Sequence, residues 1–232
     1  MTTNNAINNI YKEGRLADIK YYTSSTTWTK PSNMLDDDFI IIEGIGGGGG
    51  SGATITTGAS SSSVAGSGCG AGYFYKKIMG SDLGASETVT IGAHGLPGTG
   101  SGSAGGQGGT TSFGSHASAT GGGGGRSGGI ASAPNGKAIV GYLFPGSASG
   151  GDINIAGGMA LTSVVSYVSS SARLLGLLSG GSARAAPVAS TGASVLGNFP
   201  GGGACGAGHG SSKTFRTGNY GGAGLLTIWE YY

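Results

Sequence analysis

Short apolar runs, separated by polar or glycine-rich stretches, are the main pattern along this chain. The runs are rich in Ile, Val, Thr and aromatic residues, which are the residues most often found in strands. Proline, glycine or a cluster of aspartates follows several of them, and such residues commonly end strands. We therefore expect strands at residues 26–31, 39–43, 73–79, 87–91, 111–114, 117–120 and 224–231.

The Ser- and Leu-rich segment 161–178 gives two conflicting signals. Its β-branched and serine residues disfavour a helix, and we expect a loop or an edge segment. The neighbouring segments 138–144 and 185–199 are apolar too. The opposing signal is a set of apolar residues that would form one helical stripe, namely Leu161, Val164, Val165, Val168, Ala172 and Leu175.

Glycine accounts for 54 of the 232 residues and occurs in blocks at 46–50 and 121–125. Disordered chains combine low hydrophobicity with high charge, whereas here 9% of residues are charged and the mean hydropathy is +0.05. Glycine has no side chain to bury, so the blocks need hydrogen bonds between neighbouring extended segments. No Gly-X-Y repeat is present, which excludes collagen. We expect an all-β fold, with short strands forming a small sandwich combined with packed polyproline II-type (polyglycine II) segments.

Residues 1–24 differ in composition from the rest of the chain, with charged residues, Asn pairs and a single glycine. Ile7, Ile10 and Tyr11 fit one face of a helix. We expect residues 1–24 to be an N-terminal attachment or oligomerisation peptide; the alternative is a frayed terminus packed loosely on the domain. Residues 25–232 are expected to form one closed glycine-rich domain, with its first and last strands as neighbours.

The formal net charge is +2, from 12 Lys and Arg against 10 Asp and Glu, without a basic run. This balance argues against binding of nucleic acid or another polyanion. Neither a secretory signal pattern nor an apolar stretch of about 18 residues occurs, so we expect a protein made in a cytosol that does not span a membrane. Cys69 and Cys205 are expected to be buried thiols, with disulfide pairing as the alternative.

Glycine-rich sequences match catalytic motifs by accident, and two such matches fail in their context. The nearest phosphate-loop match ends at Gly136-Lys137, with alanine in place of its first glycine and of its magnesium-holding Ser or Thr. Ser127 has the spacing of a nucleophile elbow but follows a glycine block instead of a strand. We expect no enzyme activity and no cofactor.

Metal and carboxylate chemistry is also weakly supported. Cys205 and His209 form one close pair where a zinc site usually has two. Residues 36–38, three aspartates, lack the distal glutamate of a calcium loop and are expected to be a solvated turn. The remaining carboxylates are too scattered to predict a glycosidase pair. We therefore expect no metal site.

Taken in order, the segments resemble the glycine-rich domains of bacteriophage and prophage tail fibres over roughly residues 26–232. In composition the chain is also similar to the glycine-rich adhesins that cap the long tail fibres of T-even-like phages, where polyglycine II helices pack in layers. The segments that carry the resemblance are TTWTKP (26–31), FIIIEGI (39–45) running into five glycines, YFYKK (73–77), ETVTIGA (87–93), TSFG (111–114), GDINIAGG (151–158) and GGAGLLTIWEY (221–231).

The resemblance implies a virion protein of the phage tail that binds a receptor, either a glycan or an outer-membrane protein, on the host cell. It also implies other tail proteins as partners, bound through Ile7, Ile10 and Tyr11 of the N-terminal segment, and a homotrimer as one expected assembly. Exposed aromatic and arginine side chains suit receptor contacts. The receptor-binding candidates are Tyr142, Phe144, Tyr167, Arg173, Phe199, Phe215, Arg216 and Tyr220.

Several alternatives are open. Each receptor-binding candidate could instead be buried in a thin core. The chain could be a non-recognising structural component of the tail or baseplate, which is distinguished from a receptor-binding protein by whether aromatic residues cluster on one distal surface. An antifreeze protein would need a strict short repeat, which is missing, and an enzyme would need buried carboxylates that share a pocket.

Overall fold

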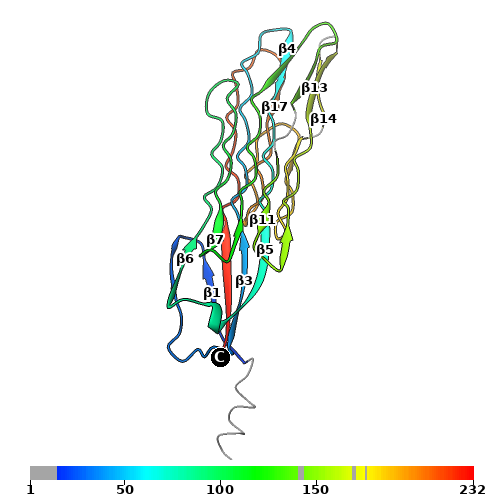
Figure 1. Cartoon of the computed structure of the whole chain (residues 1–232). Helices are drawn as coiled ribbons and strands as arrows, with labels where there is room; N and C mark the ends of the chain where they lie inside the picture. Colours follow the sequence, from blue (N-terminus) through cyan, green and yellow to red (C-terminus); the bar gives the residue numbers. More distant parts are fainter. Residues whose placement is uncertain (1–14, 141–143, 169–170, 176) are drawn as a thin grey trace, which may run out of the picture.

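The computed structural model describes residues 15–140, 144–168, 171–175 and 177–232. They form an elongated molecule with a β-sandwich at one end, a bundle of glycine-rich segments in the middle and several small sheets at the far end (Figure 1). Within these residues the one helical element is a short 3-10 turn, Gly80–Asp82. The expected all-β fold is confirmed.

Two five-stranded antiparallel sheets form the sandwich, and every strand expected from the sequence lies in it, with ends shifted by at most two residues. The first sheet has the order β1 (Leu16–Tyr22), β18 (Leu225–Tyr231), β3 (Phe39–Ile45), β5 (Tyr73–Met79) and β12 (Ile153–Ile155). The second has the order β11 (Ala148–Ser149), β8 (Ala117–Ala119), β7 (Thr111–Phe113), β6 (Ser86–Thr90) and β2 (Thr26–Thr29).

Alternating residues of the central strands build the core of the sandwich. Ile40 and Ile42 on β3 and Ile228 on β18 are fully buried. Trp28 on β2 meets Phe113 on β7 edge-to-face, with 5.7 Å between ring centroids. Burying one such side chain contributes about 1.5–3 kcal/mol. The glycine-rich segments leave from one end of this core.

Part of the N-terminal segment belongs to the sandwich. Residues 16–22, which the sequence assigns to an attachment peptide, form β1 and pair with β18 in antiparallel register. The last strand is thus enclosed by β1 and β3. The expected first strand of the domain, β2, pairs with β6 in the opposite sheet, so the expectation that it neighbours the last strand is wrong. Ile7, Ile10 and Tyr11 lie outside the described residues, so their role in attachment stays a prediction.

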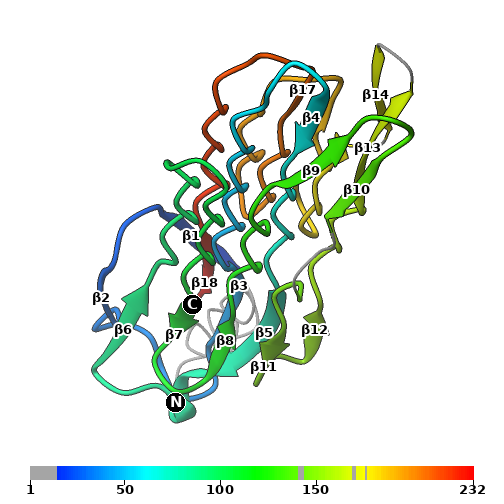
Figure 2. The same cartoon turned by 90° about the horizontal axis from the view of Figure 1, so that it is seen from above.

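The glycine-rich segments pack as extended rods around a central one, residues 46–57 (Figure 2). Its N–H groups donate to three neighbouring rods in turn, with a period of three residues, and its carbonyls accept from three others. This is the packing expected of polyglycine II segments, which satisfy their backbone groups only through neighbours. The six neighbouring rods are residues 65–72, 92–98, 103–109, 121–128, 202–207 and 216–224.

Close packing of backbone on backbone is why the central rod is glycine. A Cβ atom added at Gly48 would lie 2.0 Å from the carbonyl oxygen of Gly202, and one at Gly49 would lie 2.0 Å from that of Gly123. No side chain fits at such a distance, and these neighbours are backbone atoms that cannot turn away. The glycine block 46–50 therefore lies in a rod that is packed against neighbouring backbone on all sides.

Small sheets and a second core lie at the far end of the rods. Strand β4 (Ser61–Val64) is flanked by β17 (Gly208–His209) and β9 (Gly129–Ser132). Strand β13 (Ser163–Val168) is flanked by β10 (Lys137–Val140) and β14 (Ser171–Leu175), and β15 (Leu177–Leu178) pairs with β16 (Ala189–Ser190). The core residues here are Val64, Ala131, Ala138, Val140, Val165, Leu177 and Cys205.

The segment 161–178 is mainly strand, which corrects the expectation of a loop; of the expected edge segment, β14 does lie at the edge of its sheet, whereas β13 lies between β10 and β14. Strands β13 and β14 form a hairpin, and β15 follows. The β-branched residues that disfavour a helix also favour strands when a neighbouring sheet is present. Val165, for example, is fully buried between the sheets of the distal core.

Both cysteines are buried thiols, as expected. The Cys205 thiol donates to the carbonyl oxygen of Leu177 at 3.3 Å. Burial raises the pKa of this thiol. It behaves as a small core residue and is poorly suited to act as a thiolate at neutral pH.

Candidate functional site

The turns that connect the rods gather at the end of the molecule opposite the sandwich (Figure 1). We call this surface the distal end and define it by the turns 58–60, 99–102, 133–136, 190–193 and 210–212. The turns contact their neighbours through backbone bonds, since Ser212 N donates to Gly58 O and Ala133 N donates to Ser60 O. Loops that are far apart in the sequence therefore present one surface.

Small hydroxyl residues are common in the turns of the distal end, and exposed cations lie in the segments that adjoin these turns. Lys137 and Lys213 are exposed, and so is Arg126 at the end of its rod. Arg216 is exposed too, but its guanidinium is held in place because Nη1 donates to the carbonyl oxygen of Gly208 at 3.2 Å. The hydroxyl residues of the turns are Ser60, Thr99, Ser101, Ser190, Thr191, Ser211 and Ser212.

Only part of the predicted receptor-binding set lies here. Phe215, half-buried, and Arg216 are next to the distal turns. Tyr167 and Arg173 occupy β13 and β14 of a distal sheet, where they pair with Ala172 and Ser166 respectively. Tyr142 lies outside the described residues.

The other candidates are exposed, but they lie along the side of the rods. Phe144 is 84% exposed, and its carbonyl accepts from Gly123 in the middle of a rod. Phe199 is 54% exposed in a turn beside the sandwich, where Gly201 approaches Ile45. Tyr220 is 43% exposed and contacts His94 edge-to-face. These three residues are neither buried in a thin core nor gathered in one aromatic cluster at the distal end.

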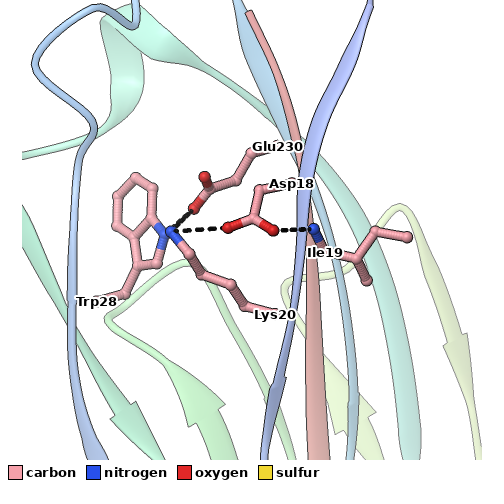
Figure 3. Close-up of polar contacts among 5 residues, drawn as sticks. All are labelled: Asp18, Ile19, Lys20, Trp28 and Glu230. Atoms are coloured by element: carbon pink, nitrogen blue, oxygen red, sulfur yellow. Dashed lines mark hydrogen bonds and ion pairs between the residues drawn. The ribbon is translucent and has the colours of Figure 1, made fainter.

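The buried polar cluster of the sandwich joins its two sheets (Figure 3). Glu230 is fully buried, and its Oε1 accepts from Trp28 Nε1 at 2.7 Å and from Lys20 Nζ at 2.6 Å. Partial burial lowers the pKa of Lys20, but the hydrogen bond and charge of Glu230 outweigh this and leave the pKa raised above its usual 10.5. With one carboxylate held by two donors, the cluster is suited to fixing β1, β2 and β18 to one another.

The described residues contain no group of three or more His, Cys, Asp and Glu side chains placed to hold a metal ion. Cys205 lies in the distal core, and His209 Nδ1 is 2.9 Å from the carbonyl oxygen of Gly210. In the same part of the chain, no helix is long and apolar enough to cross a membrane.

A shallow apolar groove runs along the side of the molecule next to β12. Ile153 and Ile155 on this edge strand are exposed, as are Met159 and Leu161 farther along the chain. Arg184, also on the groove, contacts the carboxylate of Glu43. The predicted site residues include none of these, although the apolar positions of segment 153–161 could have identified them.

Comparison with known proteins gives no match to any family model and no significantly similar curated protein. Function is therefore inferred from the geometry and from the tail-fibre resemblance. The sequence predictions also missed Arg126, Lys137 and Lys213. The signal that could have found them is the absence of Asp and Glu from residues 88–151 and 153–229.

Proposed function

We propose that this protein is a bacteriophage tail fibre or tail tip protein that binds a host cell-surface receptor during adsorption. The observation that carries the proposal is the gathering of five turns at the distal end, while β1 and the C-terminal strand lie in the sandwich at the other end (Figure 1). A protein held at its sandwich end would present all of these turns to a cell surface.

The rods are suited to hold such turns rigidly. Their backbone groups pair with neighbouring rods at donor–acceptor distances of 2.7 to 3.2 Å, as Gly48 N does with Gly222 O and Gly46 N with Gly72 O. Rod residues have few side-chain rotamers to order, so little conformational entropy is lost when a receptor binds. Function on loops that a rigid scaffold positions is a common arrangement.

The alternative is a structural component of the tail or baseplate that recognises no receptor. Phe144, Phe199 and Tyr220 favour it, because exposed aromatic residues along the side suit contacts with neighbouring virion proteins. The proposal places virion attachment at the sandwich end, in residues 1–14, with a homotrimer as one candidate assembly.

Binding of the purified chain to whole cells of candidate hosts tests the proposal. One variant carries an eight-residue Gly/Ser insertion after Thr191 in a distal turn, and a matched control carries the same insertion after Asp37 in a sandwich loop. Both positions are exposed, so both variants are expected to fold. We expect the distal insertion to reduce binding at least about tenfold, as for an interface whose central contacts are disrupted, while the control binds normally.

A version without residues 1–14 separates recognition from attachment. The proposal predicts that this version still binds cells. If neither it nor the full chain binds any host to which the parent virion adsorbs, the structural alternative is supported.

A further inference from the structure

We infer that the distal end binds an anionic polysaccharide, one that carries phosphate, sulfate or carboxylate groups. This inference rests on the proposed function and names the chemistry of the receptor. It concerns the exposed cations Arg126, Lys137, Lys213 and Arg216.

The charges are divided between the two ends of the molecule. Residues 88–151 and 153–229 contain no Asp or Glu. Every carboxylate of the described residues therefore belongs to the sandwich or its loops, and the exposed Asp36 and Asp37 are two examples. The net charge of +2 is the sum of an acidic end and a basic end. The whole-chain charge therefore does not reveal the basic end, and this is why it led to the expectation that the chain binds no polyanion.

The distal cations have no acidic partners among the described residues. The ion pairs of the described residues join carboxylates of the sandwich to Lys20, Lys30, His116 and Arg184. Within the described part of the chain, Lys137 and Lys213 are thus exposed charges without an acidic counter-ion. Arg216 is the best placed of the set, because its bond to Gly208 holds the guanidinium beside the turn 190–193.

A flexible anionic glycan fits this arrangement better than duplex nucleic acid. The cations come from separate rods and strands, for example Arg126 on one rod and Arg216 on another, and not from a single basic run or helix that could follow a duplex backbone. Hydroxyl side chains of Thr191, Ser211 and Ser212 lie in the neighbouring turns and suit sugar hydroxyls.

The same charge division would orient the molecule. An anionic cell surface attracts the basic end and repels the acidic sandwich, and such fields raise association rates in a salt-dependent way. At physiological ionic strength the field acts over about 8 Å. The distal end would therefore meet the surface first.

The test measures binding of the full chain to dextran sulfate and to unsubstituted dextran of equal length, at about 50 and 300 mM NaCl, two ionic strengths chosen to differ in screening. Two variants remove two positive charges each. K137Q/K213Q acts at the distal end, and K76Q/K77Q on β5 of the sandwich is the matched control. Each exposed ion pair changes a dissociation constant roughly two- to fivefold, so the distal variant is expected to bind dextran sulfate about 4- to 25-fold more weakly.

The inference predicts salt-sensitive binding to dextran sulfate, weak binding to dextran, and no effect of the control. Equal binding to the two dextrans, or equal effects of the two variants, overturns it. A 20-base-pair DNA duplex that competes with dextran sulfate at equal charge concentration overturns the choice of a glycan. Whole-cell binding is measured beside these probes: if cells bind both variants alike at both salt concentrations, the inference fails while the proposed function stands.

Discussion

Single glycines determine whether the rods can pack. Gly48 and Gly58 differ only in their surroundings, because a Cβ at Gly48 would overlap backbone whereas one at Gly58 would meet a single atom at 4.0 Å. We predict that Gly48→Ala lowers the free energy of unfolding by about 3 kcal/mol or more, as severe overpacking does. Gly58→Ala should be neutral or slightly stabilising, because alanine reduces the entropy of the unfolded chain. Chemical denaturation of both variants is the measurement, and equal midpoints would contradict the packing argument.

Glu230 is the residue on which the junction of the two sandwich sheets depends. Glu230→Leu would leave the buried Trp28 N–H without an acceptor, at a cost of about 1–3 kcal/mol. Asp18→Ala is the matched control, since Asp18 is exposed and 3.8 Å from Lys20 Nζ, and such pairs contribute about 0–1 kcal/mol. Urea denaturation compares the two variants. A larger loss from Asp18→Ala would refute the assigned role of Glu230.

Tyr73 should make the sandwich sensitive to alkaline pH. Burial, followed by the neighbouring Glu43, raises the pKa of Tyr73 to about 12 from a usual 10. A raised pKa in the folded state means that its contribution is intact below pH 10 and is lost as the pH rises through 12. We expect the denaturation midpoint to fall across this range and to fall less steeply in Tyr73→Phe. Tyr21→Phe, at an exposed position, should follow the wild type; a Tyr73→Phe profile that also does so would contradict the prediction.

Among the elements, the rods obey a period of three. Gly95 N donates to Gly48 O and Gly98 N donates to Ser51 O, three residues farther along both rods. A deletion of three residues from each of the rods 92–98 and 103–109 keeps this register and shortens the pair by about 9 Å, at about 3.1 Å per residue. A deletion of one residue from each turns every donor toward the wrong neighbour.

We therefore predict that the single-residue deletions destabilise the protein more than the three-residue deletions, although they remove less of the chain. Each mispaired buried backbone group costs about 1–3 kcal/mol. Thermal unfolding monitored by circular dichroism compares the two variants. The reverse order of stability would show that the rods do not depend on their register.

The sequence predicted some elements well and others poorly, for identifiable reasons. The sandwich strands were predictable because Phe39–Ile45 and Leu225–Tyr231 carry dense β-branched and aromatic residues. The strands within 161–178 were not predictable, because its serine and leucine residues form strands only where they pack beside Val64 and Val140 of the distal core. Part of the predicted site, Phe215 and Arg216, lies next to the distal turns, whereas Phe144, Phe199 and Tyr220 lie elsewhere. The sequence could not distinguish these two groups, because no local pattern says which rod face or end a residue occupies.

On the scale of the whole molecule, the topology separates acidic from basic residues, so that a chain of modest net charge has two ends of opposite charge. Successive rods run back and forth between the sandwich and the distal turns (Figure 2). The carboxylates lie in the sandwich, the hydroxyl groups lie in the distal turns, and the cations Lys137 and Lys213 directly follow two of these turns. This arrangement supports the proposed division of function, in which the distal end binds the receptor and the sandwich end attaches to the virion.

Site-specific photocrosslinking tests that division most directly. The full chain would carry a photoreactive amino acid at Ser212 in a distal turn or, as the control, at Lys77 on the sandwich, both of which are exposed. After irradiation on host cells, we predict crosslinks to envelope glycan or protein from position 212 and none from position 77. Crosslinks from position 77 alone, or equally from both positions, would contradict the account that the distal end is the receptor-binding surface.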